Sequence, residues 1–530
     1  SVPLCRALNK MDSPSQVRNP SPPPELTDNP ELLIAESIGN TAFSKHWFFT
    51  TLLKLIEEVD RENEETESEL VVDVDEDLQN ELCKLWDMSM NSEVTQFLLE
   101  FKAVEILTGV IEKSKAPRVT EICVGILCNM ACDSSICQVI ANQPQLIELI
   151  LLLLDSGDAP TLVETTRFLF TCVSNPSAQE NWIKAITEAE HFQEHIQFIF
   201  QSSTNCDLLK NTAELVHSLL DIEGNLCGAW ATQEFVQALL EAVHQIGYGH
   251  SEALEIFLHI FQLISTTEAG VEALVSCAVT LQRALLKYLN LVCEYEIVRL
   301  KDRQTSLASA LSVLNLIFTS VPQSAEQLTK DEGLFRVFLK ILEPLYPKVF
   351  PNKISQCNKS ETDKSNNASD SGMHTHSDVS KENTSDQPDH GQANKEAVRT
   401  TNGDHVTSGT NDKEADKWMV LFNILSGFLG DYLMCFVQPK DSTDTEEEEK
   451  VGPNLSHILT YLDESCSRCR TNFLILTLCG MKGDVDFVDK FKSWSEEFRK
   501  KRLMRIIKDV MAGKVINRES KSSSTDKDRR

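Results

Sequence analysis

The stretch Glu121-Ile122-Cys123-Val124-Gly125-Ile126-Leu127-Cys128-Asn129-Met130-Ala131 is an almost unbroken apolar run interrupted by a single amide. It has the composition of a buried helix, in which small and aliphatic side chains pack on several sides. Related runs, in which one polar or small residue interrupts aliphatic ones, are centred further along the chain on Cys172, Ser218, Gln262 and Asn315. Successive centres are separated by 43, 46, 44 and 53 residues. This period indicates repeats of two or three helices, as in armadillo and HEAT arrays.

The rest of the sequence favours the same fold class. It is rich in Leu, Ile and Glu, contains only 20 Gly residues, and shows no alternating β-branched run bounded by hairpin turns. A single repeat cannot bury its apolar face, so neighbouring repeats must stack to form the core. We therefore predict an all-α, armadillo/HEAT-like helical solenoid over residues 35–350.

The composition limits the possible partners. The 530 residues are 41% hydrophobic and 25% charged, with a formal net charge of −30, which disfavours non-specific binding to a phosphate backbone. Proteins with basic segments are the favoured partners if the acids line the binding face, and the alternative is that the acids only solvate the surface. The 16 Cys residues fall mostly in apolar helical stretches, where thiols behave as small hydrophobic groups. The longest apolar run, Leu149 to Leu154, is too short to span a membrane.

The N-terminal part divides into three segments. Residues 1–34 are rich in Pro, Ser and Asn, as in Asn19-Pro20-Ser21-Pro22-Pro23-Pro24, and we expect them to be disordered, with Met11 as the natural start. A first helix is predicted from Ser44 to Val59. Residues 62–77 form an acidic stretch that we interpret as a mobile loop, the alternative being a docking site for a basic partner.

The C-terminal part changes character after residue 350. Residues 351–416 are dominated by Ser, Asn, Asp, Thr and Lys and predict a disordered insertion, because they offer too little apolar surface to offset chain entropy. Helical periodicity resumes at Trp418, so we predict a C-terminal helical region over 417–515. Residues 516–530 read as a disordered tail.

Four stretches carry a resemblance to one family. They are Ser44-Lys45-His46-Trp47-Phe48, Glu81 to Met90, Phe97-Leu98-Leu99-Glu100-Phe101, and Lys113 to Arg118 running into Glu121–Leu127 and Asn129–Cys132. These stretches resemble the serum amyloid A-like (synoviocyte proliferation-associated) proteins, which are distinct from serum amyloid A itself. The resemblance is close from about residue 35 to 185, looser to about 345, and poor beyond 350.

The resemblance implies an armadillo-type fold, a nuclear location and a positive role in cell proliferation. It implies no catalytic residue and no established direct ligand. The long insertion and the basic C-terminal helix depart from the family pattern, so the resemblance implies little about residues beyond 350.

The most informative candidate residues are the amides of Asn129, Gln262 and Asn315. The third helix of an armadillo repeat lines the binding groove, where an Asn can clamp the main chain of an extended peptide through its donor and its acceptor. The ladder is interrupted by Cys172 and Ser218. The alternative is that each polar group ties down a neighbouring helix or loop. If the groove interpretation holds, changing Asn129 and Gln262 together to Ala leaves the melting temperature almost unaltered and weakens partner capture.

A second candidate surface is Trp86-Asp87-Met88-Ser89-Met90, because Trp86 with Met88 and Met90 is typical of interaction hot spots. The alternative is a buried helical stripe that contains Trp86 and Met90. Separately, Gly125 is predicted to be a packing position, where a neighbouring helix approaches too closely for a larger side chain.

A basic cluster, Arg499, Lys500, Lys501 and Arg502, is a candidate nuclear-import element. A contact with an anionic surface and an intramolecular contact with the protein's own acidic face are the alternatives. Cys466 and Cys469 have zinc-knuckle spacing but lack a second ligand pair, so we predict no metal site.

No phosphate loop, nucleophile elbow, zinc-protease or kinase motif is present in the sequence, and we expect no cofactor. We therefore expect a non-enzymatic protein-binding adaptor or scaffold in the nucleus, with the cytoplasm as a second location. We expect neither nucleic acid nor membrane as a partner. The first alternative is a karyopherin-like receptor or assembly chaperone for basic client proteins, and the remote alternative is an unrecognised enzyme.

Overall fold

The computed structural model describes residues 36–65, 73–248, 251–294, 298–349 and 408–435. The chain divides into two compact units, Ser1–Tyr288 and Leu289–Arg530, and each is described by itself. The described residues are helices and loops, with one isolated antiparallel bridge between Ser37 and Ser44 and no strand. This confirms the all-α prediction.

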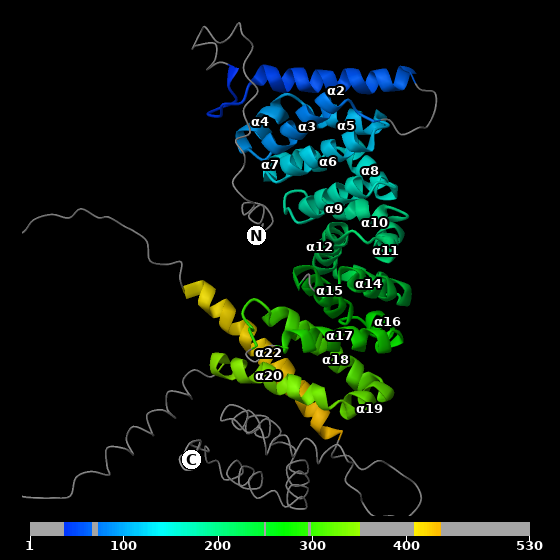
Figure 1. Cartoon of the computed structure of the whole chain (residues 1–530), viewed down its shortest axis with the longest axis vertical. Helices are drawn as coiled ribbons and strands as arrows, with labels where there is room; N and C mark the ends of the chain where they lie inside the picture. The colour runs from blue at the N-terminus through cyan, green and yellow to red at the C-terminus, as the bar shows by residue number, and fades with distance from the viewer. Residues whose placement is uncertain (1–35, 66–72, 249–250, 295–297, 350–407, 436–530) are drawn as a thin grey trace, which may run out of the picture. The chain divides into compact units, whose positions relative to one another are not determined.

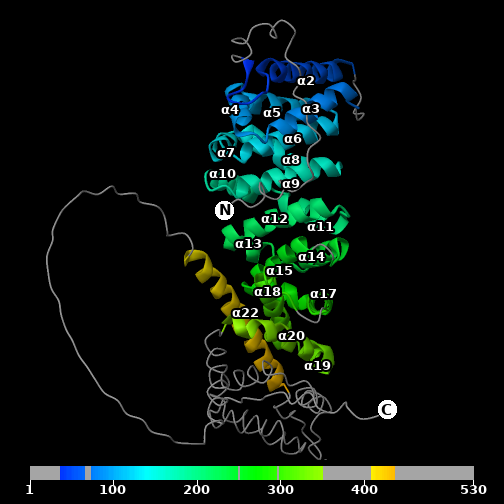
Figure 2. The same ribbon diagram turned by 60° about the vertical axis from the view of Figure 1, so that its left-hand side comes forward.

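The first unit is a stack of helical repeats (Figures 1 and 2). It begins with α2 (Lys45–Glu65) and α3 (Glu76–Met88). Four three-helix repeats follow: α4 (Ser92–Glu100), α5 (Ala103–Lys113) and α6 (Pro117–Ala131); α7 (Ser134–Ala141), α8 (Pro144–Leu152) and α9 (Ala159–Val173); α10 (Gln179–Glu188), α11 (Phe192–Ser202) and α12 (Cys206–Ile222); α13 (Gly224–Ala229), α14 (Gln233–Ile246) and α15 (Ser251–Ile264). Then come α16 (Glu268–Ser276) and α17 (Ala278–Val292), and the division between the units falls inside α17.

Local sequence signals set the helix boundaries. Side-chain oxygens of Asn91, Asp133 and Asp158 accept hydrogen bonds from backbone N–H groups in the first turns of α4, α7 and α9. These caps satisfy donors that have no partner inside the helix. Pro117 and Pro144 occupy first-turn positions of α6 and α8, where the missing N–H costs nothing.

The third helices form a continuous row. Helix α3 packs on α6, α6 on α9, α9 on α12, and α12 on α15. Hydrogen bonds join the repeats at a spacing of one repeat: Thr161 Oγ1 to the Pro117 carbonyl over 44 residues, and Ser177 Oγ to the Ser134 carbonyl over 43. The predicted period and the third-helix positions of Asn129, Cys172, Ser218 and Gln262 are confirmed.

The core of the first unit is aliphatic and aromatic. Its largest fully buried side chains are Trp182, Phe48, Phe168, Phe200, Phe235, Phe257 and Phe261. Cys123, Cys128, Cys137 and Cys172 are buried too, and the described cysteines form no disulfide. Burial raises the pKa of Cys123 to about 12, so this thiol stays protonated and packs as a small hydrophobic group, as the sequence predicted.

The second unit contains α18 (Gln304–Ser320), α19 (Pro322–Lys330), α20 (Glu332–Val349) and α22 (Ser408–Met434). Helix α22 packs along both α18 and α20 (Figure 1). The Phe428 ring lies 4.9 Å from that of Phe338 and 5.5 Å from that of Phe318, and Tyr432 joins the same cluster. Helices α19, α20 and α22 therefore form one repeat, whose second and third helices are separated in sequence by residues 350–407.

This arrangement corrects the predicted organisation in two places. Helix α22 begins at Ser408, inside the predicted insertion, and it completes a repeat rather than opening a separate C-terminal region. Helix α2 continues to Glu65 and α3 begins at Glu76, so the predicted acidic loop is shorter at both ends. Glu62 is buried and accepts the Lys115 backbone N–H at 3.4 Å, which explains why α2 extends beyond Val59.

The remaining predicted segments fall outside the described residues. They comprise 1–34, most of 351–416, 436–515 and 516–530, together with the candidate import residues Arg499, Lys500, Lys501 and Arg502. Within the described ranges, no single helix is long and apolar enough to cross a membrane, although three bent pairs of consecutive helices together meet that length and composition.

Candidate protein-binding face

The polar residues of the third-helix row fall into two groups with different surroundings. The first group, which we call the closed cluster, consists of Trp86 on α3, Gly125 and Asn129 on α6, and Glu164 and Arg167 on α9. The second group, the open stripe, lies on the third helices of the next two repeats. Its members on α12 and α15 are Lys210, Glu214, His217, Ser218, Asp221, Glu252, Glu255, His259 and Gln262.

Asn129 is a structural residue of the closed cluster. Its side chain is only 6% exposed. Its Nδ2 donates to the Trp86 carbonyl at 3.1 Å and to Ser89 Oγ at 3.0 Å, and its Oδ1 accepts from Arg167 Nη1 at 3.2 Å. The prediction that Asn129 presents its amide to a bound peptide is wrong, because neighbouring helices on both sides already use the donor and the acceptor. The alternative, that the amide ties down a neighbouring helix, is confirmed.

Arg167 links α9 to α6 and is neutralised within its own helix. Its Nε donates to Glu164 Oε2 at 2.8 Å, and its Nη2 reaches the Gly125 carbonyl at 3.4 Å. Burial raises the pKa of Glu164, and the neighbouring Arg167 charge opposes that rise. A buried pair of this kind is costly to break, because one partner then remains charged and desolvated.

The residues of the predicted hot spot around Trp86 differ in their burial. The Trp86 indole lies over Gly125, where an added Cβ would come within 2.3 Å of Trp86 Cε2, so the predicted close approach at Gly125 is confirmed. Met88 is buried in the core, whereas Met90 lies beyond the end of α3 and is 48% exposed. The three residues therefore form neither one exposed surface nor one buried stripe.

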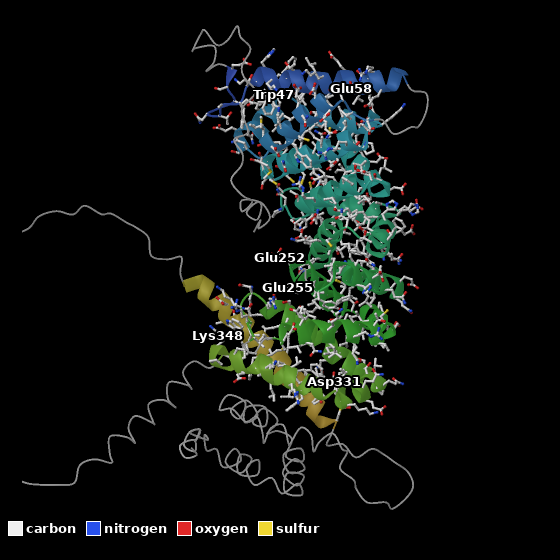
Figure 3. The ribbon with its side chains drawn as sticks, viewed as in Figure 1. Trp47, Glu58, Glu252, Glu255, Asp331 and Lys348 are labelled. Atoms are coloured by element: carbon white, nitrogen blue, oxygen red, sulfur yellow. The ribbon has the colours of Figure 1, made fainter. Side chains whose placement is uncertain are left out.

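The open stripe follows helical spacing. On α12, the polar residues recur at intervals of three or four residues or are adjacent: Lys210, Glu214, His217 and Ser218 are half-buried, and Asp221 is exposed. On α15, the polar positions recur in the same way. The two helices meet through Lys210 Nζ and Glu252 Oε2 at 3.2 Å, and the rings of His217 and His259 lie 5.7 Å apart. Figure 3 shows Glu252 and Glu255 together near the start of α15.

The open stripe is acidic at neutral pH. Its members include four carboxylates, Glu214, Asp221, Glu252 and Glu255, and one lysine, Lys210, which pairs with Glu252. Burial raises the pKa of Glu214, with Lys210 opposing and Glu252 adding to the rise. Burial lowers the pKa of His217, with Asp221 opposing, so this imidazole adds no positive charge at pH 7. A cationic group placed on the stripe would relieve this excess of negative charge.

The other predicted ladder positions differ from one another in burial and in hydrogen bonding. Gln262 is half-exposed within the open stripe, as predicted for a face residue, whereas Cys172 is fully buried. In the second unit, Asn315 Nδ2 donates to Asp431 Oδ2 of α22 at 3.1 Å. The prediction that Asn315 is available to an external peptide is wrong, because α22 packs on α18 and takes up its amide donor.

A surface groove of about 740 Å³ lies between α10 and the junction of α12 with α13. Its apolar lining includes Ile183, Ile222 and Leu226, with Glu180 and Lys184 also among the lining residues. Helix α13 has 6 residues, against 10 in α10 and 9 in α16, so the short helix leaves room there. Gly224 and Gly228 in this stretch were the sequence signal for a weak helix.

The sequence prediction missed the charged residues of the third helices. Glu164 and Arg167 are spaced three apart, and Lys210, Glu214 and Asp221 recur on one face of an otherwise apolar helix. Polar residues at helical spacing within an apolar run were the available signal. Among the described residues, no three His, Cys, Asp or Glu side chains are placed to hold a metal ion.

The repeats have three helices each and stack through their third helices. Two of these third helices, α12 and α15, share a polar stripe. This architecture is that of an armadillo-type helical repeat protein. A family model for the SAAL1 C-terminal domain matches residues 192–466, slightly more than half of the sequence. The chain therefore belongs to the SAAL1 family, which confirms the resemblance to serum amyloid A-like proteins. The family match continues to residue 466, so the expectation of a poor match beyond residue 350 is wrong.

This chain matches about three quarters of the length of the similar proteins. Protein saal1 of Xenopus tropicalis is 37% identical over 357 residues, which are 62% of this chain and 77% of that protein. Protein SAAL1 of Homo sapiens is 36% identical over 352 residues, or 61% and 73% of the two chains. A crystal structure of Uso1-1 is 10% identical to this chain, and the match covers 86% of this chain and 65% of that one with a TM-score of 0.45.

Proposed function

We propose that the protein is a non-enzymatic adaptor that binds a basic segment of a partner protein on the open stripe of α12 and α15. The observation that carries this proposal is the charge of the stripe, where four carboxylates and one lysine lie on adjacent helix faces. Complementary charge favours a Lys- or Arg-rich partner and disfavours nucleic acid and anionic membranes. The closed cluster takes no part in binding, because its polar groups are already satisfied.

The cellular part of the proposal rests on the family. We propose a nuclear adaptor that supports cell proliferation, as the resemblance to serum amyloid A-like proteins implies. The basic cluster Arg499, Lys500, Lys501 and Arg502 supports nuclear import by its composition.

A karyopherin-like receptor or assembly chaperone for basic clients is the second candidate. The acidic stripe favours it. The amide ladder that a karyopherin-like receptor would use argues against it, because the Asn129 and Asn315 amides form hydrogen bonds within the protein. An enzyme is the remote alternative. The groove beside α10 supports binding rather than chemistry, since its lining includes exposed aliphatic surface at Ile222 and exposed charges at Glu180 and Lys184.

The test is charge reversal on the open stripe of the full chain. Glu252→Lys with Glu255→Lys changes two acids of the stripe, and Glu105→Lys with Glu148→Lys makes the same charge change at exposed positions on α5 and α8. The probe is a panel of Lys- and Arg-rich peptides, with Glu-rich peptides of equal length as the negative set.

We expect the stripe variant to bind the basic peptides at least tenfold more weakly, and the α5/α8 variant to bind like the unaltered chain. Affinity of the unaltered chain should fall as salt rises, because exposed charges are screened. Equal losses in both variants would show that only net charge matters and would remove the open stripe from the proposal. Circular dichroism verifies that both variants remain folded.

A further inference from the structure

An apolar patch covers part of α2 and the end of α4. Its exposed members are Phe49 and Leu53 on α2, at 42% and 41%, and Phe101, which directly follows α4, at 40%. Trp47, labelled on α2 in Figure 3, is half-buried and precedes Phe49 by two residues, so it lies on another face of the helix. We call Phe49, Leu53 and Phe101 the aromatic patch.

The patch is anchored by buried rings. Phe49 and Phe101 meet edge to face at 5.6 Å, and Phe101 lies 5.1 Å from Phe97. Phe97 in turn lies 6.1 Å from Phe48, and both of these rings are buried. The exposed rings therefore continue a packed aromatic cluster and are held in place for contact.

The residue after Phe101 has a strained backbone conformation. Lys102, the next residue, has φ 56° and ψ 34°, in the left-handed region, and no side-chain hydrogen bond caps α5 there. A non-glycine residue rarely adopts this conformation. Strain of this kind is often found at binding sites.

The aromatic patch exposes apolar side chains on a helix face where polar ones are expected. Helix α2 packs on α3 and α5, and the face of a helix that is turned away from its neighbours is normally polar. Here Phe49 and Leu53 instead form an apolar pair at the spacing of one helical turn. Neighbouring exposed apolar groups of this kind mark contact surfaces.

We propose that the chain's own proline-rich segment, residues 19–24, docks on the aromatic patch. The segment Asn19-Pro20-Ser21-Pro22-Pro23-Pro24 lies outside the described residues, and its composition is typical of polyproline II helix. Polyproline II segments bind aromatic-lined surfaces at a low entropic cost, because they are already extended before binding.

The connection between segment and patch is short. Glu36 Oε1 accepts the His46 backbone N–H at 2.6 Å, so the chain is fixed beside the first turn of α2. Pro24 precedes Glu36 by 12 residues, which span at most about 40 Å when extended. A tether of this length gives an effective concentration of the order of millimolar, which favours the chain's own segment over a proline-rich segment of another protein.

Photocrosslinking in the full chain tests the proposal. Phe49 is replaced by p-benzoylphenylalanine, and the control places the same residue at Phe198 on α11, which is 67% exposed. We expect the position-49 protein to crosslink within one chain to a peptide containing residues 19–24, and the position-198 protein not to do so. Replacing Pro22, Pro23 and Pro24 together by Gly should lower the crosslink yield at least fivefold.

Three results would overturn the proposal. Crosslinks that join two copies of the chain would assign the patch to self-association. Equal yields from positions 49 and 198 would show that the segment touches the surface at random. Absence of any crosslink to residues 19–24 from position 49, with unaltered circular dichroism, would mean that the patch has another occupant.

Discussion

The closed cluster and the open stripe lie at corresponding positions of the third helices in successive repeats, but they differ in exposure and in their contacts with neighbouring repeats. Glu214 precedes Ser218 by four residues, as Gly125 precedes Asn129. At Gly125 the missing side chain admits the Trp86 indole, and Asn129 beside it is engaged by neighbours on α3 and α9. At Glu214 the helix face keeps a half-buried carboxylate. A polar residue at a groove position is therefore available for binding only where no neighbouring repeat closes over it.

The largest expected effect is the loss of the Asn129 amide. Asn129→Ala leaves the Trp86 carbonyl, Ser89 Oγ and one Arg167 N–H without their present partner. We expect a loss of about 1–3 kcal/mol in the free energy of unfolding, because three hydrogen bonds of a buried amide are lost, although Ser89 Oγ still donates to the Trp86 carbonyl at 2.6 Å. Chemical denaturation measures it.

Ser218→Ala, at the same level of α12, is the matched control and should cost less than about 0.5 kcal/mol. Equal losses for Asn129→Ala and Ser218→Ala would abolish the distinction between the two regions. The expectation that Asn129→Ala leaves stability unaltered belongs to the groove interpretation, which the structure has replaced.

Gly125 gives the next largest effect. In Gly125→Ala the new Cβ would lie 2.3 Å from Trp86 Cε2, so the indole or the helix must move. We expect a destabilisation of about 1–3 kcal/mol from overpacking. Gly109→Ala, in the middle of α5, has nothing within 4 Å of its new Cβ and should instead stabilise by about 0.5–1 kcal/mol.

Opposite signs for these two glycine changes, measured by thermal unfolding, would show that the Trp86 contact and not helix propensity decides the result. Combining Gly125→Ala with Trp86→Ala should recover part of the difference, because the obstructing ring is removed. Stabilisation by Gly125→Ala would contradict the close packing of the Trp86 indole over Gly125 in the closed cluster.

The sequence predicted those features that depend on local pattern. Helix periodicity located the third helices through Cys172, Ser218 and Gln262, and the apolar context of Gly125 predicted its close approach. The environment of Asn129 depends on Trp86 and Arg167, which lie 43 and 38 residues away and act only after the repeats stack. No local pattern carries that information.

The same limit applies to the second unit. Helix α22 packs on α18 and α20, although residues 350–407 separate it from α20 in sequence, so its composition identified a helix but not the repeat to which it belongs. The aromatic ring of Phe428 packs against Phe318 and Phe338, and these contacts exist only in the folded unit. The polar insertion in the sequence suggested a boundary where the fold has none.

The pH dependence of stability gives a smaller effect in the open stripe. Burial raises the pKa of Glu214 above its ordinary value of 4.5, so the protonated form is favoured in the folded state. Its contribution to stability is present below pH 4.5 and is lost as the pH rises through the raised pKa. Glu214→Gln should therefore raise the melting temperature by about 1–2 °C at pH 7 and leave it unaltered near pH 4.

Glu105→Gln, at an exposed position on α5, provides the baseline for removing one negative charge from the chain. The difference between the two variants at pH 7 isolates the effect of the stripe. A larger gain at pH 4 than at pH 7 would have the wrong sign for a raised pKa.

The smallest expected effect on stability comes from Gln262, and it separates binding from folding. Gln262 is half-exposed on α15 among the acids of the open stripe, so Gln262→Ala should alter the free energy of unfolding by no more than about 0.5 kcal/mol. The same change removes a donor and an acceptor next to the proposed site, and we expect basic peptides to bind a few-fold more weakly. Asn129→Ala should show the converse: lower stability, with the peptide affinity of the folded protein unchanged. Titration of both variants with one Lys- and Arg-rich peptide, at a temperature where both are folded, makes the comparison. If Asn129→Ala alone weakened the peptide, the binding surface would lie at α6 and the open stripe would lose its proposed role.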